Sequence, residues 1–228
     1  MLARSSTMAC AVLLAANACG ARAPRTDTPP IGESRAPSGP AIDAACRALC
    51  ALRPDYAGSS KPAPLFTLST IDGAVVKMEE LRGKVVLLNV WSSVAAGAVT
   101  AEMPELAKLA AALRSRKDVV LVTIAAEDYP EHATDLLKAT LGDAKKYTVL
   151  VDRGAKVAEE IGTRRYPETW LVDRNGVMRA RFDGKRAWSD PKVMAMLDAT
   201  RDGAFCPVEI DGGYISGAGD TACEAAAR

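Results

Sequence analysis

Cysteine is the residue type in this chain best suited to covalent chemistry, and four of the six cysteines lie beyond the first 40 residues: Cys46, Cys50, Cys206 and Cys223. An even number favours disulfide bonds in an exported chain, and the first residues predict export. Cys46 and Cys50 are four apart in a segment with helical character, where Cβ atoms lie about 5–6 Å apart. A disulfide needs about 3.5–4.5 Å. We therefore expect each to bond one of the two C-terminal cysteines, with the pairing left open.

Two other uses of these cysteines are possible. Cys46 and Cys50 could form a relocated redox pair, but that pair requires a strained or unwound helix. A zinc site built from all four is less favoured still, because oxidation competes for the thiols. We expect structural disulfides, with no metal and no cofactor.

A second stretch predicts a strand, a turn of small residues and a helix. Residues 84–91 read as a buried strand that runs through a turn of small residues into a helix. Ala95 and Ala98 stand at that turn, three apart, where a helix N-terminus would stabilise a thiolate. Alanine cannot ionise. No base is evident near Ser92, Ser93 or Thr100, so we expect these hydroxyls to cap the turn or the helix.

The motifs around this turn extend over most of the chain. They comprise residues 63–68, Asp72, Gly73 and residues 78–84, then Asn89, Trp91 and residues 102–106, then residues 166–176. In this order and spacing they resemble the TlpA/ResA/DsbE-type thioredoxin-like proteins of the bacterial cell envelope, from about residue 63 to residue 197. The resemblance implies a thioredoxin fold and, in active members, thiol-disulfide exchange.

The resemblance also assigns roles to individual residues. Ala95 and Ala98 replace the redox pair, with one extra residue between Ala98 and Glu102. Glu102 would handle protons for the missing thiols, and without them we expect a first-turn glutamate favoured by the helix dipole. Tyr166 and Pro167 would form a cis peptide bond that faces the site and exposes backbone to a substrate peptide. Trp91 completes the predicted binding residues.

The N-terminus predicts export. Residues 1–19 combine Arg4, a short apolar run and a small-residue cleavage site, as in a signal peptide. Cys10 lies inside this segment, and Cys19 resembles a lipoprotein acceptor; cleavage after Ala18 with simple secretion is the alternative. Residues 20–42 are poor in large apolar side chains and are expected to be a flexible linker. We expect a periplasmic protein or a membrane-anchored lipoprotein of a bacterial envelope.

The rest of the chain alternates short apolar runs with helical periodicity. Strands are expected at 85–90, 119–124, 148–151, 169–172 and 177–182, with helices between them and a last helix opening at Asp190. Asn175 and Gly176 predict a hairpin. The pattern gives a mixed sheet flanked by helices with an N-terminal hairpin, the thioredoxin architecture. Trp188, in a polar loop, is expected to be exposed, and His132 to be solvated.

We therefore divide the chain into the signal (1–19), the linker (20–42), a cysteine-containing helical segment (43–62), a thioredoxin-like domain (63–200) and a cysteine-containing C-terminal extension (201–228). A formal net charge of +1 gives no support to nucleic-acid binding. The favoured function is a redox-silent binding or assembly factor with an unidentified protein or peptide partner in the envelope, held to the membrane if Cys19 is acylated. The alternatives are an oxidoreductase acting through Cys46 and Cys50, or alanines engineered at positions 95 and 98.

Overall fold

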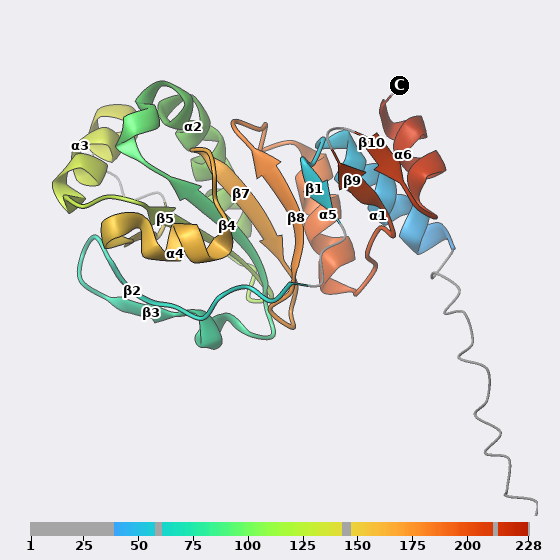
Figure 1. Cartoon of the computed structure of the whole chain (residues 1–228), viewed down its shortest axis with the longest axis horizontal. Helices are drawn as coiled ribbons and strands as arrows, with labels where there is room; N and C mark the ends of the chain where they lie inside the picture. Colours follow the sequence, from blue (N-terminus) through green and yellow to red (C-terminus); the bar gives the residue numbers. More distant parts are fainter. Residues whose placement is uncertain (1–38, 58–60, 143–146, 212–213, 228) are drawn as a thin grey trace, which may run out of the picture. The chain divides into compact units, whose positions relative to one another are not determined.

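The computed structural model describes residues 39–57, 61–142, 147–211 and 214–227 (Figure 1). The predicted signal peptide, Cys10, Cys19 and most of the predicted linker lie outside these residues. No helix within the described ranges is both long enough and apolar enough to cross a bilayer.

The main sheet has eight strands in the order β1-β8-β7-β4-β5-β6-β2-β3. The strands are β1 (Tyr56–Ala57), β2 (Thr67–Thr70), β3 (Val75–Lys77), β4 (Val85–Trp91), β5 (Val119–Ala125), β6 (Val149–Val151), β7 (Glu168–Val172) and β8 (Met178–Asp183). Strands β4, β5 and β6 are mutually parallel, and the remaining pairings are antiparallel. The sheet is therefore mixed, with the hairpin β2–β3 at one edge.

Strand β4 is central because it is apolar on both faces, as a strand covered by helices must be. Val85 and Leu87 point into a cluster with α2 (Ala96–Leu113) and α5 (Pro191–Arg201). Val86 and Leu88 point to the other face, against α4 (Lys156–Ile161) and the 3₁₀ turn η1 (Met78–Leu81). Figure 1 shows α4 in front of the sheet.

Short turns and one further helix complete this body. The 3₁₀ turn η2 (Ser93–Ala95) joins β4 to α2, and η3 (Arg153–Ala155) precedes α4. Helix α3 (Pro130–Leu141) packs beside α2, with Ala133 buried in a small cluster that also contains Trp91 and Val99. The β7–β8 turn is closed by a hydrogen bond from the Gly176 N–H to the Asp173 carbonyl, and Gly176 has φ +79°.

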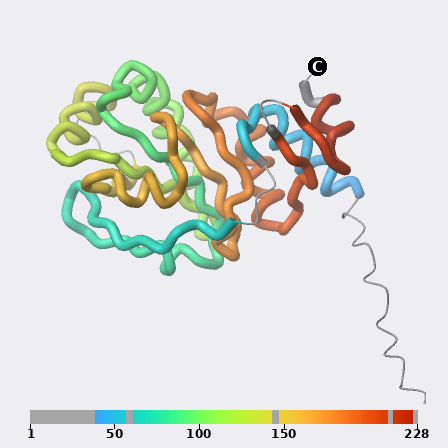
Figure 2. The backbone as a smooth tube through the Cα atoms, in the orientation of Figure 1, coloured from blue at the N-terminus to red at the C-terminus, as the bar shows by residue number. Residues whose placement is uncertain are grey.

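The two ends of the described chain form a unit of their own against this body. Helix α1 (Pro40–Ala51) packs on α5 and on α6 (Asp220–Ala227), next to the two-stranded sheet of β9 (Glu209–Asp211) and β10 (Tyr214–Ser216). In Figure 2 the blue segment and the red segment lie side by side. Their apolar residues Leu49 and Val208 belong to the same core cluster as Leu87.

One arginine links the segment that follows α1 to the loop before α5. The Arg186 guanidinium, in the loop before α5, donates to the carbonyls of Leu52 and Arg53, both at 3.1 Å, and to Asp55 Oδ2 at 2.8 Å. It therefore satisfies backbone acceptors beyond the end of α1 that would otherwise need water.

The predicted fold class is confirmed: a mixed sheet flanked by helices, with an N-terminal hairpin and a cysteine-containing C-terminal region. Three details differ from the sequence expectations. Helix α1 begins at Pro40, so the last three residues of the predicted linker (20–42) are helical, because proline is well accommodated at a helix start. Strand β1 extends the sheet into the segment 43–62 by pairing with β8. Trp188 is buried, not exposed, because its ring packs edge-on against Phe182 under α5.

Candidate functional site at the start of helix α2

The start of α2 presents small apolar side chains. Ala95 is the N-cap of the helix and is half-buried, whereas Ala98 is exposed. Val99 is only 2% exposed and begins a buried stripe that continues through Glu102, Met103 and Leu106. This spacing of three, four and seven residues is one face of an unbroken helix.

Helix α2 begins at Ala96, directly after the η2 turn, and each further residue rotates the side-chain direction by about 100°. The buried stripe begins at Val99. The inward-facing position of the first turn is therefore Val99, and Ala98 points to solvent.

A buried glutamate that the sequence analysis missed anchors the η2 turn. The Ser92 hydroxyl and the Ser93 N–H both donate to Glu127 Oε1, the former at 3.1 Å. Ser92 also caps the turn by accepting from the Val94 N–H. Glu127 follows β5, so its sequence neighbourhood gives no sign of the contact; only the parallel pairing of β4 and β5 brings it to the turn.

Glu102 lies beneath the helix start and is 1% exposed. Asn89 Nδ2 donates to Oε2 at 3.1 Å and Trp188 Nε1 donates to Oε1 at 2.6 Å. Burial raises the pKa of Glu102, and the donors from Trp188 and Asn89 oppose that rise. The expected first-turn glutamate is thus wrong: Glu102 is the seventh residue of α2 and lies three residues after Val99 on the same buried face.

The same network ties three elements together. Asn89 Nδ2 also donates to Thr169 Oγ1 at 2.9 Å, so β4 is linked to β7 as well as to α2. Asn89 Oδ1 has no hydrogen-bond partner among the described residues. Trp91, a predicted binding residue, is buried nearby and supports the site from below without reaching its surface.

The loop before β7 lies beside the end of β4. The Tyr166–Pro167 peptide bond is cis. Because Val90 pairs with Glu168, Pro167 falls next to the carboxyl end of β4, from which η2 and α2 continue. Pro167 is buried and Tyr166 half-buried, and no intramolecular hydrogen bond involves the Tyr166 N–H or carbonyl within the described chain.

Buried carboxylates surround this loop. Glu168 accepts from Trp170 Nε1 at 2.7 Å and from the Arg164 N–H at 3.3 Å. Burial raises the pKa of Glu168, and burial together with nearby carboxylates raises the pKa of Tyr166. The Tyr166 hydroxyl is therefore protonated at neutral pH and can donate a hydrogen bond.

Two large side chains of apolar or aromatic character are exposed near these groups. Val94, in η2, is 84% exposed, and Tyr129, which precedes α3, is 60% exposed. The Tyr129 ring lies 5.5 Å from that of His132, with the two ring planes tilted by 51°, and His132 is exposed as expected. The site thus combines exposed apolar side chains and unpaired backbone with a helix start that carries no nucleophile.

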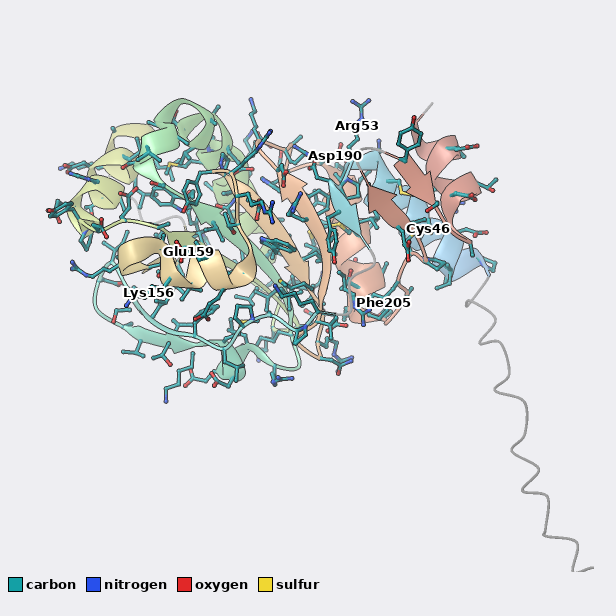
Figure 3. All side chains as sticks on the ribbon, in the orientation of Figure 1. Cys46, Arg53, Lys156, Glu159, Asp190 and Phe205 are labelled. Carbon is teal, nitrogen blue, oxygen red and sulfur yellow. A yellow bond between two sulfur atoms is a disulfide. The ribbon has the colours of Figure 1, made fainter. Side chains whose placement is uncertain are left out.

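All four cysteines in the described chain are bonded at a distance from this site. Cys46 pairs with Cys206, and Cys50 pairs with Cys223. The Cα–Cα distances are 4.7 and 5.2 Å, within the normal range for disulfides. Cys46 is labelled in Figure 3, on α1. Cys46 and Cys50 are not bonded to each other.

Known proteins resemble the chain over the body that carries this site. The Redoxin family profile matches residues 58–197. The thiol:disulfide interchange protein DsbE of Pseudomonas fluorescens biotype C is 30% identical over 149 residues, which cover 62% of this chain and 79% of that protein. The thiol-disulfide oxidoreductase ResA of Bacillus thuringiensis is 25% identical over 128 residues, covering 55% and 70%.

Solved structures agree with these matches. The crystal structure of a DsbE-type thiol:disulfide interchange protein from Chlorobium tepidum superposes with a TM-score of 0.54 at 25% identity, covering 63% of this chain and 99% of the other. The matched region contains the whole of β4, α2 and the cis-proline loop. With well over half of its residues matched by the family profile, and with the thioredoxin fold in place, this chain belongs to the Redoxin family.

Proposed function

We propose that this Redoxin family protein binds an extended peptide segment of a partner protein at the start of α2, without exchanging disulfides there. The observation that carries the proposal is the side-chain content of the helix start. Neither the predicted pair, Ala95 and Ala98, nor the neighbouring pair, Ala96 and Val99, can form a mixed disulfide.

Features suited to peptide binding accompany this loss. An extended segment needs backbone partners and pockets or patches for alternate side chains. The unpaired N–H and carbonyl of Tyr166 supply the backbone groups, and the exposed side chains of Val94 and Tyr129 supply apolar contact. The Tyr166 hydroxyl adds a donor.

The surface is also held in place, which lowers the entropic cost of binding. Glu127 fixes the η2 turn through Ser92 and Ser93, and Glu102 joins α2 to Asn89 and Trp188. These contacts use buried polar groups, so the helix start and the proline loop keep their relative positions when no partner is bound.

The test uses two exposed valines as a matched pair. Peptides selected from a random library against the full chain are measured for affinity to Val94→Glu and to Val75→Glu. Val75 lies on β3 at the far edge of the sheet and is 57% exposed. We expect Val94→Glu to weaken binding at least about tenfold, since it introduces an unpaired charge at the interface, and Val75→Glu to leave it unchanged. Equal effects of the two substitutions would contradict the proposal.

Attachment to the cell envelope is the second part of the proposal. It is supported by the signal-like residues 1–19, by Cys19, and by two disulfides, which are typical of proteins in oxidising compartments. Labelling an expressing bacterium with an alkyne fatty acid should mark the protein, and Cys19→Ser should abolish the label and release the protein from the membrane fraction. An unlabelled protein in the soluble periplasm would favour simple secretion.

An oxidoreductase acting through a Cys46–Cys50 pair is the weaker candidate. Each of these sulfurs is bonded to a cysteine of the C-terminal extension, and α1 is a regular helix through both positions. No observation favours a direct bond between them.

A further inference from the structure

The sulfur atoms of the two disulfides form one cluster. The Sγ atoms of Cys50, Cys206 and Cys223 all lie within 4.8 Å of one another, although Cys206 belongs to one bridge and the other two belong to the second. The backbone also approaches closely here: a Cβ on Gly219 would lie 2.6 Å from Cys46 Sγ and 2.8 Å from Cys206 Sγ. Only glycine at this position leaves the first bridge room.

The four sulfurs differ sharply in access. Cys46, Cys50 and Cys223 are buried in the core cluster, whereas Cys206 is partly exposed. Cys206 lines a cavity of about 600 Å³ between α1, α5 and the C-terminal extension. Its walls include Leu49, Met196 and Phe205, and the last of these is labelled in Figure 3. A thiol entering this cavity meets Cys206 first.

We propose that these four cysteines form a thiol-disulfide exchange site in which Cys206 is the sulfur attacked by an external thiol. This proposal is independent of peptide binding at α2. In the first step a thiolate attacks Cys206 Sγ, the Cys46–Cys206 bond breaks, and Cys46 leaves as a thiolate that takes up a proton. A second external thiolate attacks the added sulfur of the mixed disulfide. The two external thiols are thereby oxidised to a disulfide, and Cys206 is released as a thiolate.

The cluster gives that thiolate a second reaction. Cys206 Sγ lies within 4.8 Å of both sulfurs of the Cys50–Cys223 bridge. Attack on Cys50 forms a Cys50–Cys206 bond and expels Cys223 as a thiolate; attack on Cys223 expels Cys50 instead. In either step the partly exposed Cys206 ceases to be a thiolate, and a buried cysteine becomes the thiolate instead. Attack on Cys50 keeps the C-terminal extension tied to α1 by one bridge, whereas attack on Cys223 joins two cysteines of the extension and leaves no bridge to α1.

The experiment follows the order in which bonds open. The oxidised full chain is incubated in glutathione buffers of increasing reducing strength, quenched with an alkylating reagent, digested and mapped by mass spectrometry. We expect glutathione first on Cys206 together with alkylated Cys46, followed by a peptide crosslinked between Cys206 and either Cys50 or Cys223. First opening of the Cys50–Cys223 bridge, or release of all four thiols together, would overturn the proposal.

Two paired variants serve as controls. Cys46→Ala with Cys206→Ala leaves only the buried bridge, and we expect its reduction to be at least about tenfold slower than that of the first bridge in the wild type. Cys50→Ala with Cys223→Ala keeps the exposed bridge and should react with glutathione at the wild-type rate, with no rearranged crosslink. Equal rates for the two variants would count against Cys206 as the point of attack. Peptide affinity measured with Val94→Glu reports separately on the site at α2.

Discussion

Two glutamates on α2, three residues apart, have opposite electrostatic environments. Glu102 faces the core, where burial raises its pKa. Glu105 lies at the surface, where hydrogen bonds from Lys108 and Ser189 lower its pKa to about 2. The difference arises from burial, because Glu102 lies within the buried stripe whereas Glu105 lies at its edge and accepts hydrogen bonds from Lys108 and Ser189.

Replacing Glu102 should make folding less sensitive to pH. With its pKa raised, the native state binds the proton more tightly than the unfolded state. The stability this provides is complete below the ordinary value of 4.5 and is lost as pH rises through the native pKa. As the pH rises from 4 to 8, we expect the free energy of unfolding of Glu102→Gln to increase relative to that of the wild type. The increase is about 1.4 kcal/mol for each tenfold difference in proton affinity between the native and the unfolded state, and urea unfolding at each pH measures it.

Glu105→Gln is the matched control, with the opposite sign. A lowered pKa contributes stability above 4.5 that is lost as pH falls towards about 2. The variant should therefore be less stable than the wild type at neutral pH and approach it in acid, by a small amount because the pair with Lys108 is exposed to solvent. Parallel pH profiles for the two variants would contradict both assignments.

Among the elements, α2 determines which chemistry the family scaffold performs here. The helix still begins where β4 ends, and its N-terminal N–H groups would still stabilise a thiolate. What the start of the helix lacks is a side chain that ionises. On the first turn, positions 96 and 99 are three apart, and the second of them faces inward at the beginning of the buried stripe.

Cysteines introduced at positions 96 and 99 should give the helix start thiol-disulfide exchange activity. We expect Ala96→Cys with Val99→Cys to reduce insulin disulfides faster than the wild type, with the thiol at position 99 alkylated at least about tenfold more slowly than the thiol at position 96. Burial of position 99 and exposure of the helix start give the difference.

The comparison is Ala95→Cys with Ala98→Cys. Ala98 is exposed, so both introduced thiols should react readily with alkylating reagent and insulin reduction should stay close to the wild-type rate. Activity in this second pair and not in the first would contradict the choice of positions 96 and 99.

At the scale of the whole molecule, the two disulfides connect the beginning and the end of the described chain. They span 160 and 173 residues in sequence. Because they lie side by side, the loops they close in the unfolded chain are almost the same loop. Either bridge therefore removes most of the chain entropy that both remove together.

The losses of stability caused by removing the two bridges should consequently not add up. With one bridge intact, the other closes a ring of only roughly 20 residues, worth about 3 kcal/mol, whereas the last bridge closes a loop of well over 100 residues, worth about 5 kcal/mol. Unfolding of Cys50→Ala with Cys223→Ala, of Cys46→Ala with Cys206→Ala, and of the quadruple variant measures this. Shared loop closure would be contradicted if the quadruple variant lost no more unfolding free energy than the sum of the losses in the two double variants.

The sequence by itself determined the local features of this protein. The apolar runs, the helical spacings and the Asn175–Gly176 turn depend on neighbours within a few residues, so they predict the mixed sheet and its last hairpin. None of the residues from 92 to 102 is cysteine, so the sequence likewise excludes a thiol nucleophile at that turn.

The tertiary structure alone decided the contacts between distant residues. Three of these contacts join residues 35 to 160 positions apart: the disulfide between Cys46 and Cys206, the hydrogen bond from Trp188 to Glu102, and the hydrogen bond from Ser92 to Glu127 at the η2 turn. Such contacts follow from how helices pack on the sheet, which no local pattern specifies. For the same reason Trp188, which lies in a polar loop, is buried.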